Sequence, residues 1–160
     1  MSRLDSFIRR MTAQRDILNQ VADDAILPEQ GAILEFGLGN GRTYSHLQEL
    51  YPSRRIIVFD RVQMAHSSCI PDEENLVLGE IIETAREYIG FDAAMVHADI
   101  GSGSDEIDAV TVQWLPELMS GVLSSGGIAI CGLPLEHEEL SPLAIPEAID
   151  NKRYFLYRKN

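Results

Sequence analysis

Cysteine, basic residues and long apolar runs are all scarce in this 160-residue sequence. Its two cysteines, Cys69 and Cys131, lie far apart and match no metal-binding spacing, so we expect reduced thiols in a reducing compartment. The N-terminal residues are charged and lack the apolar centre of a signal peptide, and no apolar run approaches the roughly 20 residues of a membrane helix. These absences predict a cytoplasmic protein with no membrane partner.

The scarcity of basic residues also bears on partners. Thirteen Lys and Arg residues stand against 25 Asp and Glu residues, which gives a formal net charge of -12 at pH 7. Phosphate backbones repel such a surface, so we expect no nucleic-acid partner. The length and a hydrophobic content of 45% are ordinary for a globular chain and predict a single domain over residues 1–160.

Helical and strand patterns alternate along the chain. Apolar residues at helical spacing between residues 4 and 22 predict an amphipathic N-terminal helix that ends before Pro28. The strands are expected at residues 32–36, 56–60, 76–78, 93–97, 128–131 and 154–157, and the later helices at 42–50, 81–89 and from 105, with a kink or restart at Pro116. This order predicts an α/β fold: a doubly wound, mostly parallel sheet with helices on both faces, preceded by the N-terminal helix.

The first strand leads into a glycine-rich turn, Glu35-Phe36-Gly37-Leu38-Gly39-Asn40-Gly41. Ligands bind outside the carboxyl ends of parallel strands, and the N–H groups of the following helix suit an anionic group such as a carboxylate. A dinucleotide-binding turn of the form Gly-x-Gly-x-x-Gly needs its third glycine at position 42, which is Arg42. The third glycine comes one residue early, at Gly41, which disfavours a dinucleotide.

The acid-x-Gly-x-Gly-x-Gly pattern resembles motif I of the class I S-adenosylmethionine-dependent methyltransferases. Asp60, at the end of the second strand, matches the acid of that family that accepts hydrogen bonds from the ribose hydroxyls. Gly79-Glu80-Ile81 is similar to the segment after the third strand of that family, in which the acid contacts the adenine amino group. Residues 123–128 are similar to the family's turn before the fifth strand. The resemblance covers residues 32–131 and implies S-adenosylmethionine as the cofactor.

The resemblance also implies the site residues. The residues expected to bind the cofactor are Glu35, Phe36, Gly37, Leu38, Gly39, Gly41, Arg42, Thr43, Asp60, Arg61, Gly79, Glu80, Ile81 and His97. His97 and Asp99 lie at the end of the fourth strand and are the expected catalytic groups; a structural, hydrogen-bonded histidine is the alternative for His97. This stretch is also similar to the Asp-Ala-Asp of metal-dependent catechol-type O-methyltransferases, but residues 131–134 lack the further ligands, so we expect no metal.

The resulting hypothesis is an S-adenosylmethionine-dependent methyltransferase that acts on a small-molecule acceptor. Two alternatives stay open: a non-catalytic S-adenosylmethionine-binding protein or subunit, and an NAD(P)-dependent oxidoreductase. Phe7 and Trp114 are expected in the core rather than beside the acceptor. The chain has no sizeable insertion to build an acceptor pocket, so either the N-terminal helix roofs a small site or a second copy completes it as a homo-oligomer.

Overall fold

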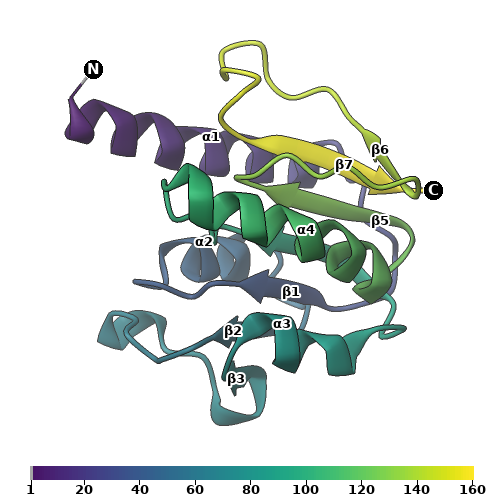
Figure 1. Ribbon diagram of the computed structural model, residues 1–160. Helices are drawn as coiled ribbons and strands as arrows, with labels where there is room; N and C mark the ends of the chain where they lie inside the picture. The colour runs from purple at the N-terminus through teal and green to yellow at the C-terminus, as the bar shows by residue number, and fades with distance from the viewer. Residues whose placement is uncertain (1) are drawn as a thin grey trace.

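Seven strands form one sheet in the order β3-β2-β1-β4-β5-β7-β6 in the computed structural model, which describes residues 2–160 (Figure 1). The strands are β1 (Ile33–Phe36), β2 (Ile56–Asp60), β3 (Leu76–Leu78), β4 (Ala93–Ala98), β5 (Leu123–Cys131), β6 (Leu140–Pro142) and β7 (Phe155–Lys159). The helices are α1 (Arg3–Asp23), α2 (Arg42–Leu50), α3 (Ile81–Thr84) and α4 (Asp105–Val122). Strands β1 to β5 pair in parallel and β7 runs antiparallel to β5, which confirms the predicted fold class.

Strand β1 lies at the centre of the parallel part of the sheet. Ile33 is paired with Ile56 of β2 on one side and with Met95 of β4 on the other. All four residues of β1 are buried, as is typical of a parallel strand covered on both faces. The carboxyl ends of β1, β2 and β4 therefore meet at one edge of the sheet.

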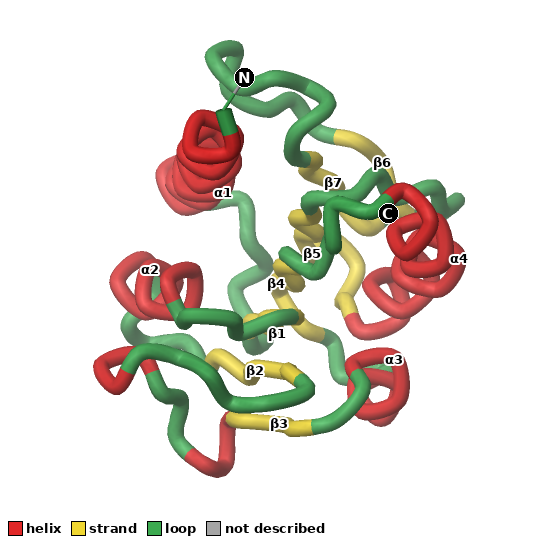
Figure 2. The backbone as a smooth tube through the Cα atoms, turned by 60° about the vertical axis from the view of Figure 1, so that its left-hand side comes forward, coloured by secondary structure: helices red, strands yellow, loops and turns green. Residues whose placement is uncertain are grey.

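The helices cover the two faces of the sheet in pairs. Figure 2 shows α1 and α2 on one face and α3 and α4 on the other. Alternate residues of β1 point to opposite faces: Ile33 packs in the cluster that contains Leu18 of α1, and Leu34 packs in the cluster that contains Leu115 of α4. The short apolar strands thus bury both of their faces.

Helix α1 is buried in its second half and overhangs the sheet in its first (Figure 1). It starts with a capping box, in which Ser2 and Asp5 bond each other's backbone N–H groups. Leu18 is 1% exposed, whereas Leu4 is 66% exposed and Phe7 39%. The expectation that Phe7 belongs to the core is wrong, because this part of α1 extends beyond the strands.

Three further elements differ from the sequence prediction. One strand was expected after β5, but β6 also pairs with β7; it is only three residues long and includes Pro142, which an edge strand tolerates. The helix expected over residues 81–89 is α3 followed by a 3-10 turn, Ala85–Tyr88. Helix α4 continues through Pro116, whose buried neighbours Leu115 and Leu118 pack on the sheet and offset the lost hydrogen bond.

No helix within residues 2–160 combines the length and the apolar character needed to cross a membrane.

Candidate functional site

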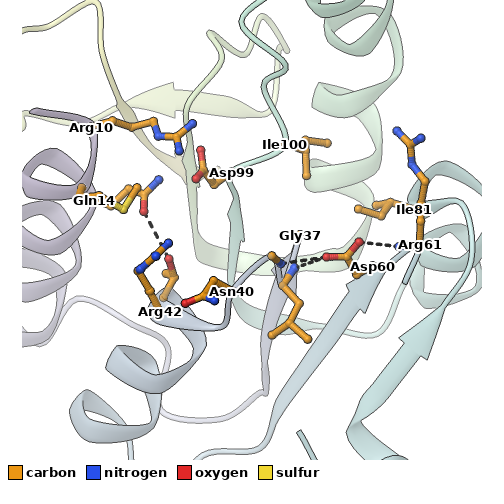
Figure 3. A pocket seen from close by; sticks show the side chains of 14 residues that line it. Arg10, Gln14, Gly37, Asn40, Arg42, Asp60, Arg61, Ile81, Asp99 and Ile100 are labelled. Carbon is orange, nitrogen blue, oxygen red and sulfur yellow. Dashed lines mark hydrogen bonds between the residues drawn. The ribbon is translucent and has the colours of Figure 1, made fainter. Parts of the chain in front are cut away.

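A cavity of about 340 Å³ lies at the carboxyl ends of β1 to β4. Its walls are the turn after β1, Asp60 and Arg61 after β2, Ile81 of α3, Asp99 and Ile100 after β4, and one face of α1. Figure 3 shows Arg10, Gln14 and Arg42 on one side and Asp60, Arg61 and Ile81 on the opposite side. Its size falls within the roughly 300–1,000 Å³ of small-molecule sites.

The glycines of the turn after β1 serve two different purposes. Gly41 (φ +84°) precedes α2, and a Cβ there would lie 2.6 Å from the Cβ of Cys69. Gly39 (φ +50°) lines the cavity, and a Cβ there would meet nothing within 4 Å. Packing therefore requires a glycine at position 41, whereas at position 39 the glycine keeps space open for a ligand.

Asp60 fixes the shape of this turn. Its Oδ2 accepts hydrogen bonds from the backbone N–H groups of Leu38 (2.8 Å) and Gly39 (3.0 Å), and its Oδ1 accepts one from the N–H of Arg61 (2.7 Å). A carboxylate oxygen has two lone pairs, so Oδ1 can still accept a bond from a hydroxyl group. Asp60 can thus hold the turn and a ligand at the same time.

Below the cavity, His97 is fully buried in a polar network. Its Nδ1 lies 3.0 Å from Oε2 of Glu35, and its Nε2 lies 2.8 Å from the hydroxyl of Tyr154. A carboxylate only accepts hydrogen bonds, so Nδ1–H of His97 donates to Glu35, and Nε2 shares a hydrogen bond with the hydroxyl of Tyr154. Both ring nitrogens are used, and His97 does not line the cavity.

Burial and charge act together on the pKa values in this network. Burial raises the pKa of Glu35, although the neighbouring His97 opposes the shift. Burial alone would lower the pKa of His97, but the charge of Glu35 and its hydrogen bond raise that pKa above the ordinary value. Burial also raises the pKa of Tyr154 well above 10, so its hydroxyl stays protonated. The three groups hold β1, β4 and the segment before β7 together.

The structure brings most of the predicted site residues together. The predicted residues that line the cavity are Gly37, Leu38, Gly39, Arg42, Thr43, Asp60, Arg61, Ile81 and Asp99. The remaining ones are Glu35, Phe36, Gly41, Gly79, Glu80 and His97, which support its walls or lie beside it. Glu80, for example, forms an exposed ion pair with Arg61 (3.6 Å).

Five residues that line the cavity were missed from the sequence: Arg10, Met11, Gln14, Asn40 and Ile100. The first three belong to α1, where no site residue was predicted. One signal was available, because Gln14 interrupts an apolar stripe formed by Phe7, Met11, Leu18 and Val21. No group of three or more His, Cys, Asp or Glu side chains in the described part of the chain is arranged to hold a metal ion.

Comparison with known proteins decides the family. Residues 1–159 match the family described as S-adenosyl-L-methionine methyltransferase. The chain belongs to this family. It is thus a methyltransferase with S-adenosylmethionine as its cofactor, and the family membership decides against the oxidoreductase alternative.

Solved structures agree with this assignment. The S-adenosyl-L-methionine methyl transferase of Silicibacter pomeroyi DSS-3 is 35% identical, with a TM-score of 0.91 over 100% of this chain and 99% of that chain. A Podospora anserina methyltransferase bound to S-adenosylhomocysteine is 13% identical, with a TM-score of 0.59 over 100% and 80% of the two chains, and shares the fold. No curated protein matches this chain in sequence.

The cavity of the methyltransferase fits this cofactor. Gly39 leaves open the space that a side chain would fill, and Oδ1 of Asp60 keeps one lone pair for a ribose hydroxyl. The N-terminus of α2 follows the same turn, and Gly41, its N-cap, supplies no side chain to its N–H groups.

Substitution by alanine is expected to affect mainly ligand binding at Gly39 and mainly stability at Gly41. Gly39→Ala is expected to leave the free energy of unfolding within about 1–2 kcal/mol of wild type, the cost of a positive φ, but to weaken S-adenosylhomocysteine binding at least tenfold. Gly41→Ala is expected to lower the free energy of unfolding by more, because its methyl group meets Cys69. Urea unfolding and calorimetric titration measure the two quantities, and unchanged affinity in Gly39→Ala would contradict the assigned role.

The network predicts that His97 is a positioning residue. His97→Leu leaves Glu35 buried without its partner and is expected to lower the free energy of unfolding by roughly 3–5 kcal/mol. The double variant Glu35→Leu/His97→Leu removes both groups and should recover part of that loss. Urea unfolding of both variants tests this, and a His97→Leu protein of wild-type stability that has lost turnover would show a catalytic His97 instead.

Proposed function

We propose that this methyltransferase holds S-adenosylmethionine in the cavity and transfers the methyl group to a small-molecule acceptor, with Asp99 as the general base. The Asp99 carboxylate carries this proposal. It lines the cavity and makes no hydrogen bond or ion pair within residues 2–160, whereas three N–H groups engage Asp60, the other acid of the cavity.

When bound, S-adenosylmethionine supplies a methyl group on a positively charged sulfur: the bond from carbon to the acceptor forms as the carbon–sulfur bond breaks, leaving S-adenosylhomocysteine. The protein contributes mainly by alignment, which is worth about 7–11 kcal/mol of the barrier in well-oriented reactions. Where the acceptor atom carries a proton, Asp99 takes it, and the rigid β4 below positions this carboxylate.

The charge of the chain supports a small acceptor. The net charge of -12 opposes the approach of RNA or DNA. Neighbours in fold include a protein described as a sugar N-methyltransferase and one described as a putative ribosomal RNA methyltransferase. Both are under 25% identical, so the charge of this chain is what favours the small acceptor.

Two earlier expectations stay predictions. A cytoplasmic location is still expected from the cysteine usage. Self-association also stays a prediction, and the exposed apolar side chains of α1, among them Leu4 and Ile8, offer a surface for it.

A labelling experiment tests the acceptor class. The enzyme is incubated with methyl-labelled S-adenosylmethionine and separate small-molecule, RNA and protein fractions of a cell extract. Label is expected in the small-molecule fraction, and label in RNA or protein would contradict the proposal.

With that acceptor, Asp99→Asn is expected to lower kcat about 10²- to 10⁴-fold, the usual contribution of a general base, without changing S-adenosylhomocysteine affinity. Asp105→Asn, on the exposed first turn of α4, is the matched control. A loss of affinity in Asp99→Asn at unchanged kcat would show that Asp99 binds the cofactor rather than the acceptor's proton.

A further inference from the structure

Helix α1 presents two buried hydrogen-bond donors without a partner among the described residues. These are Nε of Arg10 and Nε2 of Gln14, and both residues line the cavity. Gln14 is only 3% exposed, so water does not readily replace a missing partner. Buried donors are nearly always paired in folded proteins, and these two therefore point to a ligand with acceptor atoms.

Neighbouring side chains fix how the two groups are presented. The hydroxyl of Thr43 donates to Oε1 of Gln14 (3.3 Å), which leaves the amide nitrogen as the group without a partner. The Arg10 guanidinium lies over the Phe7 ring, 5.9 Å from its centroid. Figure 3 shows Arg10 and Gln14 on the same side of the cavity, as expected for residues four apart on one helix.

The hydrogen-bond donors of Arg10 and Gln14 favour an anionic ligand. Arginine offers only donors in a planar fork that suits a carboxylate, and Gln14 adds one more donor. S-adenosylmethionine carries its carboxylate at the end of the molecule remote from the ribose. Asp60, the expected ribose ligand, lies on the side of the cavity opposite Arg10 and Gln14 (Figure 3).

We propose that Arg10 and Gln14 bind the methionyl carboxylate of S-adenosylmethionine, and that α1 thereby selects the intact amino-acid cofactor against its decarboxylated form. This inference rests on the proposed cofactor site and adds α1 as the element that recognises the amino-acid end of the cofactor. Helix α1 is fixed for that task by a 2.8 Å hydrogen bond between Asn19 and His46 and by one from Gln20 to the carbonyl of Ala144 (3.1 Å).

The test measures binding affinities by calorimetry in a double cycle. One change removes the carboxylate from the ligand, and the other removes the donor from the protein. Wild type is expected to bind S-adenosylmethionine roughly 10- to 100-fold more tightly than decarboxylated S-adenosylmethionine, the range for a hydrogen bond to a charged group. Arg10→Ala should bring this ratio close to one by weakening only the first ligand. Gln14→Met, similar in size, should reduce the ratio by a smaller factor.

Arg15→Ala is the matched control, because Arg15 lies on the same helix, pairs with Asp16 at 2.8 Å and does not line the cavity. It should keep the wild-type ratio. Wild-type affinity of Arg10→Ala for the decarboxylated ligand shows that this variant is folded.

Equal binding of both ligands by wild type, or an equal loss for both in Arg10→Ala, would overturn the inference while leaving the cofactor site in place. If wild type bound neither ligand nor S-adenosylhomocysteine, the proposed function itself would fail.

Discussion

The site depends on the burial of β1 between β2 and β4. This strand has four residues, all buried, and its neighbours are paired with it in parallel on both sides. Parallel pairing brings the carboxyl ends of the strands to one edge, so the turn after β1, Asp60 and Asp99 meet there without any contact having to draw them together. Because the strand is short and central, a shift of its register would displace every wall of the cavity that the sheet supplies.

Two polar interactions then give this edge its defined shape. Asp60 draws the glycine turn toward β2 through the N–H groups of Leu38 and Gly39. Beneath it, the buried contact between Glu35 and His97 ties β1 to β4. Glu35, the acid that precedes the glycines in the motif, therefore supports the site from below, because its contact with His97 holds β4, the strand that precedes Asp99. Glu35 itself does not line the cavity.

The sequence predicted most of the sheet and the wall of the cavity that follows it. Continuous apolar runs and the glycine turn are local signals, so β1, β2, β4 and Asp60 could be placed from them. Two kinds of feature could not. Strand β6 has three residues and a proline, and its pairing with β7 depends on tertiary contact. Arg10 and Gln14 are about 25 residues before the turn that they face, and only the packing of α1 brings them there. The roles of His97 and Asp99 also could not be distinguished without the fold. Both ring nitrogens of His97 are hydrogen-bonded in the core, whereas Asp99 lines the cavity.

The central claim is that the cofactor site has two sources: the carboxyl edge of the sheet and helix α1. Hydrogen–deuterium exchange of the enzyme with and without saturating S-adenosylhomocysteine tests it directly. The account predicts slower exchange at residues 37–43, 60–61 and 99–100, and also at residues 7–14 of α1, because the ligand would contact both. Protection confined to the sheet edge, with unchanged exchange over residues 7–14, would contradict the account and leave α1 outside the site.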